Sequence, residues 1–422
     1  MQAISRFLFT LWVTTAALQA FALNIGGNPL FYYYLVQVLL VGLGFVLPTR
    51  PANRAVRIPM SLLLAFLLVA TIGTFALPAF YAGTPAFVPR ISIDEQMLGM
   101  TPASFSLSNV VQLVYLTTNV IAVVFAAQGR FGDLTRPFRY GALGAAGIIA
   151  LSIFADWLQL SFWTNGLSDI LRNNEAGAVF DNLILDNVRR ISGSFSEPSY
   201  AGVFSSALSA YFLSRFLEEK RIVDLGAGLT MALCVILTTS LLGVVGLLVT
   251  AGLLVFRYMR RYFLIFAALC VGAVGFYLLH GIAAIDQLYL NRSGESTINR
   301  LTSDARSFEI LSETNYLGLG LGSHRASSLF STMLANTGLV GGLLYLAALL
   351  SLFLTRVPDD RVTTITPLRF FVLTAWTTIL FGAPELSTPS LWTGVVAFVS
   401  LAAVPVRSAP SYRPRPAMVP AT

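Results

Sequence analysis

Apolar runs of about twenty residues alternate with short polar connectors from the N-terminus of this chain to about Val406. A helix needs about 20 apolar residues to cross the hydrocarbon core of a bilayer. Each run therefore predicts one membrane-crossing helix. The predicted helices cover residues 6–24, 30–48, 58–81, 108–128, 138–160, 199–217, 223–238, 242–257, 262–280, 328–355, 366–383 and 389–406.

The composition supports the same class of fold. Of the 422 residues, 56% are hydrophobic and only 11% are charged, whereas a soluble domain carries about a quarter charged residues. We therefore predict an all-α polytopic membrane protein with about twelve transmembrane helices. The first run resembles a signal peptide but lacks a clear cleavage site, so we expect a retained helix. Residues 223–256 form either two short helices or one long helix broken at TTSLLG.

Basic residues indicate the orientation of the chain. The net charge is +7, Lys220 is the only lysine, and most arginines stand in short connectors. Such an excess marks cytoplasmic connectors, so the charge requires no nucleic acid. With both termini in the cytoplasm of a bacterial inner membrane, every such cluster falls on the cytoplasmic side. The clusters are Arg50, Arg54 and Arg57; Arg130, Arg136 and Arg139; Arg215, Lys220 and Arg221; Arg257, Arg260 and Arg261; Arg356 and Arg361; and Arg407, Arg413 and Arg415.

Three longer connections, residues 82–107, 161–198 and 281–326, then fall on the periplasmic side. The last two connections carry arginines, contrary to the positive-inside pattern, and this favours a binding role for these arginines. Acidic residues in the same loops leave open that some of the arginines form ion pairs within the protein. We predict one transmembrane domain over residues 1–406, with an active cavity under the loops near 161–198 and 281–326. The proline-rich residues 407–422 predict a disordered cytoplasmic tail.

The stretch RRISGSFSEPSYAG, residues 189–202, concentrates polar chemistry at a predicted membrane boundary. A guanidinium fork suits a phosphate oxygen pair, so Arg190 and Arg189 are candidate ligands of a lipid diphosphate. Glu197 precedes Pro198, which suits the first turn of a helix. Glu197 is therefore either an N-cap or a general base for a sugar hydroxyl, with supporting donors at Ser199 and Tyr200.

The second loop offers further candidates. Arg300, Arg306 and Arg325 form a group that could bind two phosphates, and His324 is a second candidate base or a solvated loop histidine. GLGLGS lacks the strand and lysine of nucleotide-binding loops, so it predicts a turn into a helix whose amides could face an anion. No acidic pair is arranged to bind a metal, and we expect neither metal nor cofactor.

These motifs together resemble the O-antigen polymerase and ligase superfamily over residues 181–350. The resemblance rests on Arg190, Gly193, Pro198 and Ser199; on TTSLLGVVGLL; and on the glycines of YLGLGLGS with Gly338 and Gly341. A glutamate before the proline looks most like the exopolysaccharide, or Wzy-type, polymerase branch. Ser327 stands where ligases have a histidine, which counts against the ligase.

The resemblance implies a GT-C-like, metal-independent glycosyltransferase that joins undecaprenyl-diphosphate-linked repeat units into a surface polysaccharide or exopolysaccharide at the periplasmic face. Its substrates would be a lipid-linked glycan donor and acceptor in the bilayer, and its further partners a chain-length regulator and a flippase. Two alternatives stay open: an O-antigen ligase that transfers a finished glycan once, and a transporter or flippase of lipid-linked sugars.

Overall fold

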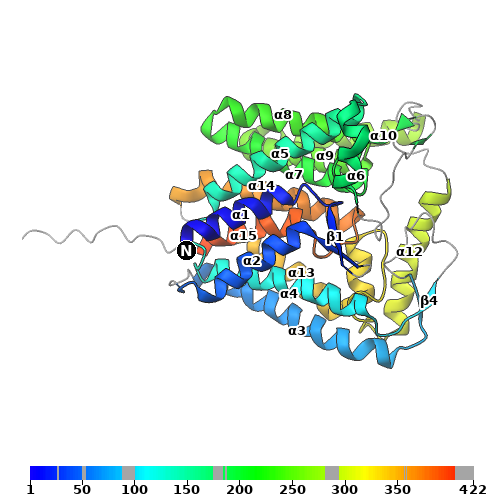
Figure 1. Cartoon of the computed structure of the whole chain (residues 1–422). Coiled ribbons are helices and arrows are strands. Elements are labelled where there is room, and N and C mark those ends of the chain that lie inside the picture. Colours follow the sequence, from blue (N-terminus) through cyan, green and yellow to red (C-terminus); the bar gives the residue numbers. More distant parts are fainter. Residues whose placement is uncertain are drawn as a thin grey trace, which may run out of the picture.

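The computed structural model describes residues 1–25, 28–49, 54–87, 100–173, 184–185, 188–280, 294–355, 357 and 359–403. Long helices dominate this part of the chain (Figure 1). Each of the apolar runs forms a helix, and most boundaries lie within four residues of the prediction. These helices are α1 (Gln2–Thr15), α2 (Tyr32–Val46), α3 (Arg57–Phe80), α4 (Leu107–Ala127), α5 (Thr135–Trp157), α7 (Pro198–Glu219), α8 (Ile222–Leu237), α9 (Leu241–Tyr258), α10 (Phe263–His280), α13 (Leu329–Phe353), α14 (Val362–Gly382) and α15 (Pro389–Ala403).

The remaining elements are short, except for α12. Three antiparallel hairpins pair β1 (Ala22–Ile25) with β2 (Asn28–Phe31), β3 (Pro85–Ala86) with β4 (Thr101–Pro102), and β5 (Ile184–Leu185) with β6 (Val188–Arg189). A π-turn, Trp163–Leu167, precedes α6 (Ser168–Leu171), and short 3-10 turns cover Arg54–Val56, Arg260–Tyr262 and Asp359–Arg361. Helix α12 (Gly294–Glu313) lies inside the region predicted as a loop. The tail 407–422 lies outside the described residues.

Two local differences from the sequence have clear causes. Helix α1 ends at Thr15, before its predicted end, because the chain turns into the β1–β2 hairpin. The TTSLLG region contains a real break. Thr239 has left-handed backbone angles, with φ of 49°, and the Ser240 hydroxyl accepts a bond from the Gly243 N–H to start α9. Of the two alternatives left open for residues 223–256, the structure therefore has two separate helices, α8 and α9.

Six described helices are long and apolar enough to cross a membrane: α3, α4, α5, α9, α13 and α14. Helices α2, α8 and α15 are apolar but shorter. Many large apolar side chains of these nine helices point outward. Phe75 of α3 and Leu248 of α9, for example, are 57% and 51% exposed. An apolar exterior of this kind suits lipid, so the all-α membrane protein class is supported.

Helix α7 is the centre of the bundle. It packs against α8, α9 and α14, and nearly every residue from Pro198 to Arg215 is buried. Small residues bring α7 and α9 into close contact: a Cβ on Gly202 would lie 3.0 Å from the Gly243 Cα. The same packing mode joins helices in membranes, where small residues let backbones approach. The motif residues 189–202 therefore lead directly into a largely buried helix.

The two ends of the bundle differ in chemistry. The N-terminus lies at one end, and α12, β1 and β4 lie at the other, where α12 runs across the ends of the long helices (Figure 1). At the N-terminal end, the fully buried Asp224 of α8 pairs with Arg139 of α5 at 3.1 Å and with Arg215 of α7 at 3.5 Å. Some predicted cytoplasmic arginines thus join helices to one another.

Candidate functional site

The segment from Thr314 to Ser328, between α12 and α13, is a tightly packed turn. Gly318, Gly320 and Gly322 have φ values of 83°, 87° and 77°, which side chains rarely adopt. A Cβ on any of them would also meet neighbouring backbone at 3.0 Å or less. We refer to this segment as the glycine turn.

The amides of the glycine turn are used within the protein. Leu319 and Gly320 donate to the carbonyls of Ala335 and Asn336, each at 2.8 Å, and Leu321 donates to the Thr74 hydroxyl at 3.2 Å. Gly318 donates to the Thr314 hydroxyl at 2.9 Å. These four amides do not face an open anion site, so the turn positions side chains and is not itself a phosphate cradle.

Helix α13 is bent to receive the glycine turn. Gly338 within it has φ 68° and ψ −174°, a conformation essentially confined to glycine. Asn336, two residues earlier, clamps the glycine turn: its side chain donates to the His324 carbonyl at 2.7 Å and accepts from the His324 N–H at 2.9 Å. The glycine pattern therefore fixes the backbone of His324 and Arg325.

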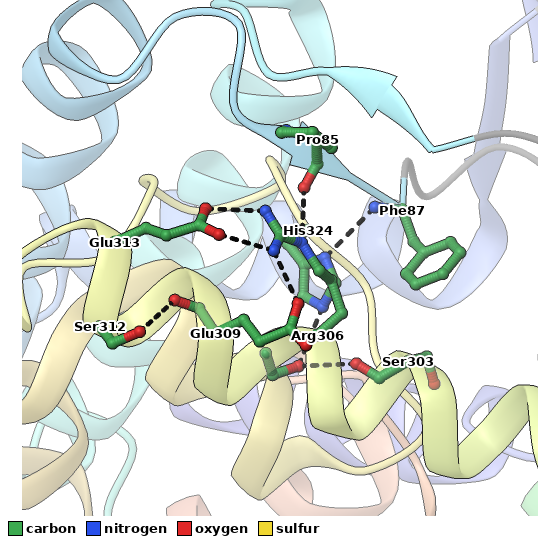
Figure 2. A network of polar contacts seen from close by, with 9 residues as sticks. Pro85, Phe87, Ser303, Arg306, Glu309, Ser312, Glu313 and His324 are labelled. Carbon is green, nitrogen blue, oxygen red and sulfur yellow. Dashed lines mark hydrogen bonds and ion pairs between the residues drawn. The ribbon is translucent and has the colours of Figure 1, made fainter.

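The ring of His324 is also committed within the protein. Its Nδ1 accepts the Phe87 N–H at 3.3 Å, so the proton of the neutral ring is on Nε2, which lies 2.9 Å from the Ser307 Oγ (Figure 2). Ser307 in turn donates to the Ser303 carbonyl. His324 is 1% exposed. Its burial is the main cause that lowers the pKa of His324 to about 4, and the charge of Arg306 contributes a smaller part. This arrangement suits a structural histidine better than a general base.

Arg306 lies beside His324 and is held by carboxylates (Figure 2). Its guanidinium makes a bidentate pair with Glu313, at 2.7 and 2.8 Å, and a third bond to Glu309 at 2.7 Å. Its Nε donates to the Pro85 carbonyl at 3.0 Å. The internal pairing that the sequence left open is therefore observed for Arg306, which fastens α12 to the β3 segment.

Arg325 instead lines a small pocket. It pairs with Glu385, whose Oε1 lies 3.2 Å from an Arg325 Nη, and the two side chains are 25% and 35% exposed. We call this cavity, of about 40 Å³, the Arg325 pocket. It is lined by Gln112 of α4; Leu321, Gly322, His324 and Arg325 of the glycine turn; Leu329, Thr332, Met333 and Asn336 of α13; and Pro384, Glu385 and Leu386 between α14 and α15. Its size admits two or three water molecules.

Three residues of the 189–202 stretch come to Arg325 or its neighbours. Tyr200 and Glu197 both act electrostatically on Arg325. Burial alone would lower the pKa of Arg325, but Glu385, Tyr200 and Glu197 hold this pKa above its ordinary value, so the guanidinium stays charged. Ser199 donates to a Glu197 carboxylate oxygen at 2.9 Å. Glu197 occupies the N-cap position of α7 without bonding to the first backbone amides.

Tyrosines from two further helices complete the surroundings. Tyr33 and Tyr34 of α2 and Tyr115 of α4 all lie within electrostatic range of Glu385. Tyr34 and Tyr115 stack with ring centroids 3.7 Å apart, and the Tyr34 hydroxyl donates to the Ser387 carbonyl at 3.0 Å. Five segments that are distant in sequence thus converge on one ion pair.

The other predicted residues lie elsewhere. Arg190 follows β6 and is partly buried, and the side chain of Arg189 lies outside the described part of the structure. Arg300 is on α12, and its Nε has no hydrogen-bond partner among the described residues. Neither Arg190 nor Arg300 is among the residues that line the Arg325 pocket. Ser327, at the ligase histidine position, donates to Asp304.

Sequence reasoning missed Glu385 and the tyrosines. Glu385 had a detectable signal, because it is the only acidic residue after Asp360 and interrupts an otherwise apolar stretch between two predicted helices. Tyr33, Tyr34 and Tyr115 read as ordinary residues of apolar helices, and only the fold brings them together. Among the described residues, no three His, Cys, Asp or Glu side chains gather in a group that could hold a metal ion.

The molecule is thus defined as an all-α protein whose apolar helices suit a membrane, with a charged pocket at one end of the bundle. No protein-family model matches the chain, and no curated protein matches it either.

Proposed function

We propose that this protein joins lipid-diphosphate-linked oligosaccharides by glycosyl transfer, as a polysaccharide polymerase. The observation that carries the proposal is the Arg325 pocket. It offers a charged guanidinium and a carboxylate at one end of a bundle of apolar helices, with a second carboxylate and a buried tyrosine within electrostatic range of the guanidinium. Arginine is suited to a diphosphate, and a carboxylate to the proton of a sugar hydroxyl.

The proposal includes the topology. The chain crosses the inner membrane about twelve times, with both termini in the cytoplasm and the Arg325 pocket at the periplasmic face. Support comes from the position of the pocket at the opposite end from the N-terminus, together with the starts of α2, α4, α7 and α15. A donor with its lipid tail in the bilayer would reach the pocket at the level of its diphosphate.

Charge stabilisation would be the main catalytic effect. As the anomeric carbon leaves the diphosphate, negative charge grows on the bridging oxygen, and a positioned guanidinium stabilises that charge more than it stabilises the ground state. Removing one such donor typically costs about a hundredfold or more in rate. Arg325 is placed for this role by the glycine turn, and Arg190 and Arg300 are the proposed further diphosphate ligands.

The test uses purified protein in liposomes with an undecaprenyl-diphosphate-linked repeat unit and no nucleotide sugar. A ladder of lengthening glycans on a gel is expected for the wild type. Arg325→Ala should slow it roughly a hundredfold. Asp360→Asn is the matched control, because Asp360 is 72% exposed in the turn before α14, at the other end of the bundle.

Other outcomes would overturn the proposal in distinct ways. A single transfer to another acceptor without a ladder identifies a ligase. Movement of intact lipid-linked sugar between leaflets without a new glycosidic bond, measured by protection from an impermeant reagent, identifies a transporter. Full activity of a well-inserted Arg325→Ala would show that the pocket takes no part in the mechanism. Full activity of Arg190→Ala would show that Arg190 is not a diphosphate ligand.

A further inference from the structure

The position of Glu385 is fixed by its backbone more than by its side chain. In the loop between α14 and α15, the Thr388 hydroxyl donates to the Glu385 carbonyl and the Trp392 Nε1 donates to the Leu386 carbonyl, each at 2.8 Å. Tyr34 donates to the neighbouring Ser387 carbonyl. Among the described residues, the Glu385 carboxylate has a single ion-pair partner, Arg325.

The surroundings make that partner important. The groups within electrostatic range of Glu385 come from four segments around it: Tyr33 and Tyr34 of α2, Tyr115 of α4, Tyr200 of α7 and Arg325 of the glycine turn. The tyrosines are neutral near pH 7, so Arg325 is the only positive charge among these groups. The ion pair occupies the carboxylate oxygen that faces Arg325, and breaking the pair leaves that oxygen open to a hydroxyl donor.

The other candidate bases are less suitable. Glu197 sits at the N-cap of α7 and already accepts the Ser199 hydroxyl, and it is not among the residues that line the Arg325 pocket. His324 has both ring nitrogens engaged. Glu385, by contrast, lines the Arg325 pocket directly.

We infer that Glu385 is the general base of the transfer and that Arg325 restrains it until the donor binds; this inference rests on the proposed function. A diphosphate on Arg325 competes with the carboxylate for the same guanidinium. Phosphate oxygens accept the fork of donors bidentately, so Glu385 is released as the donor enters, and the small resting pocket opens.

The hydroxyl oxygen of the acceptor sugar bonds to the anomeric carbon of the donor, and its proton passes to the Glu385 carboxylate. The bond between the anomeric carbon and the phosphate oxygen breaks, and its electron pair stays on the polyprenyl diphosphate, beside Arg325. When the diphosphate leaves, Glu385 returns its proton to solvent and pairs with Arg325 again.

This scheme predicts an effect on binding that needs no turnover. The probe is undecaprenyl diphosphate without sugar, added to the protein in nanodiscs and followed by titration calorimetry. A partly exposed ion pair is worth up to about 1 kcal/mol, so Glu385→Gln should bind the probe up to about fivefold more tightly than wild type. Arg325→Ala should bind it more weakly, and Asp360→Asn should match wild type.

Proton uptake gives a second reading that a structural role would not produce. Titrations in two buffers of different ionisation enthalpy report protons taken up on binding. Wild type should take up more protons than Glu385→Gln, because the released carboxylate gains affinity for a proton. In the liposome assay, Glu385→Gln should polymerise about 10²- to 10⁴-fold more slowly. Glu385→Asp, which keeps the charge, should retain part of the rate. It is the control that distinguishes loss of the carboxylate from misfolding of the Glu385→Gln variant.

The outcomes separate this inference from the proposed function. Polymer formation by wild type with an unchanged rate in Glu385→Gln overturns the inference alone. Weaker probe binding by Glu385→Gln, or equal proton uptake in the two proteins, also overturns it. A third outcome is tight probe binding with the expected difference in proton uptake, but no polymer from the wild type. This outcome supports the exchange of Glu385 for diphosphate on Arg325 and counts against the polymerase.

Discussion

His324 offers a quantitative test of its assignment as a structural residue. Its buried ring has a pKa of about 4, against an ordinary value of 6.5. Because the pKa of His324 is lower in the folded protein, the folded protein binds this proton only at a lower pH than the unfolded chain does. The contribution of the neutral His324 ring to the free energy of unfolding is therefore fully present above about pH 6.5 and is lost as the pH falls toward 4.

The size of the effect follows from linkage. At pH 5 the ring of the unfolded chain is almost fully protonated, whereas the folded ring is mostly neutral. The resulting loss is about 2 kcal/mol relative to pH 7 and approaches about 3 kcal/mol below pH 4. His324→Gln removes this titration and also disrupts the contacts with Phe87 and Ser307, at a pH-independent cost of about 1–3 kcal/mol.

The assay is the free energy of unfolding of wild type and His324→Gln in mixed micelles, at pH 7 and pH 5. The wild type should be the more stable protein at pH 7, and the difference between the two should shrink by about 2 kcal/mol at pH 5. His280 is present in both proteins and cancels. A difference that is the same at both pH values would refute a neutral buried ring. Loss of turnover in a fully stable His324→Gln would restore His324 as a candidate base.

Three further substitutions test separate parts of the fold by unfolding in the same micelles. Asp224→Asn should lower the free energy of unfolding by about 3 kcal/mol, because it leaves Arg139 without its counter-ion and the buried Arg215 with Glu219 alone; an unchanged stability would contradict the pairing. Gly338→Ala should cost at least about 2 kcal/mol through its backbone angles, whereas Gly147→Ala, whose added Cβ meets nothing within 4 Å, should be neutral or slightly stabilising. Arg306→Gln should cost about 1–2 kcal/mol and loosen α12, seen as faster amide exchange there, without weakening diphosphate binding; a loss of binding would return Arg306 to the site.

The apolar helices could be predicted because each signal is local. A run of about twenty apolar residues bounded by proline, glycine or arginine contains both the helix and its ends. The prediction was wrong only where apolar character continues through a change of structure, as after Thr15, where the β1–β2 hairpin is nearly as hydrophobic as the helix before it. Hydrophobicity alone does not separate these two conformations.

Helix α12 was missed for a different reason. Residues 294–313 are too polar to cross a membrane and were therefore assigned to a loop. Their pattern was nonetheless helical, since Glu309 and Glu313 follow Arg306 at spacings that place all three on one face of a helix. Recognising the helix would have predicted the observed pairing and removed Arg306 from the diphosphate ligands.

The Arg325–Glu385 pair lies beyond what one sequence can specify. Arg325 was identified because it breaks the positive-inside pattern, and Glu197, Ser199 and Tyr200 because they share a motif. Glu385 belongs to no motif with them. Its relation to Arg325 arises from the bend of α13 at Gly338 and the packing of α14 and α15, which are tertiary features.

The assembly of the Arg325 pocket from distant segments has a consequence for biosynthesis. Ribosomes deliver Tyr33 and Tyr115 first, then Glu197 and Arg325, while Glu385 arrives with the loop before α15. Until that loop is inserted, the Arg325–Glu385 pair is missing and the pocket lacks one wall. A nascent chain therefore cannot complete the pocket before the loop that precedes α15 is inserted.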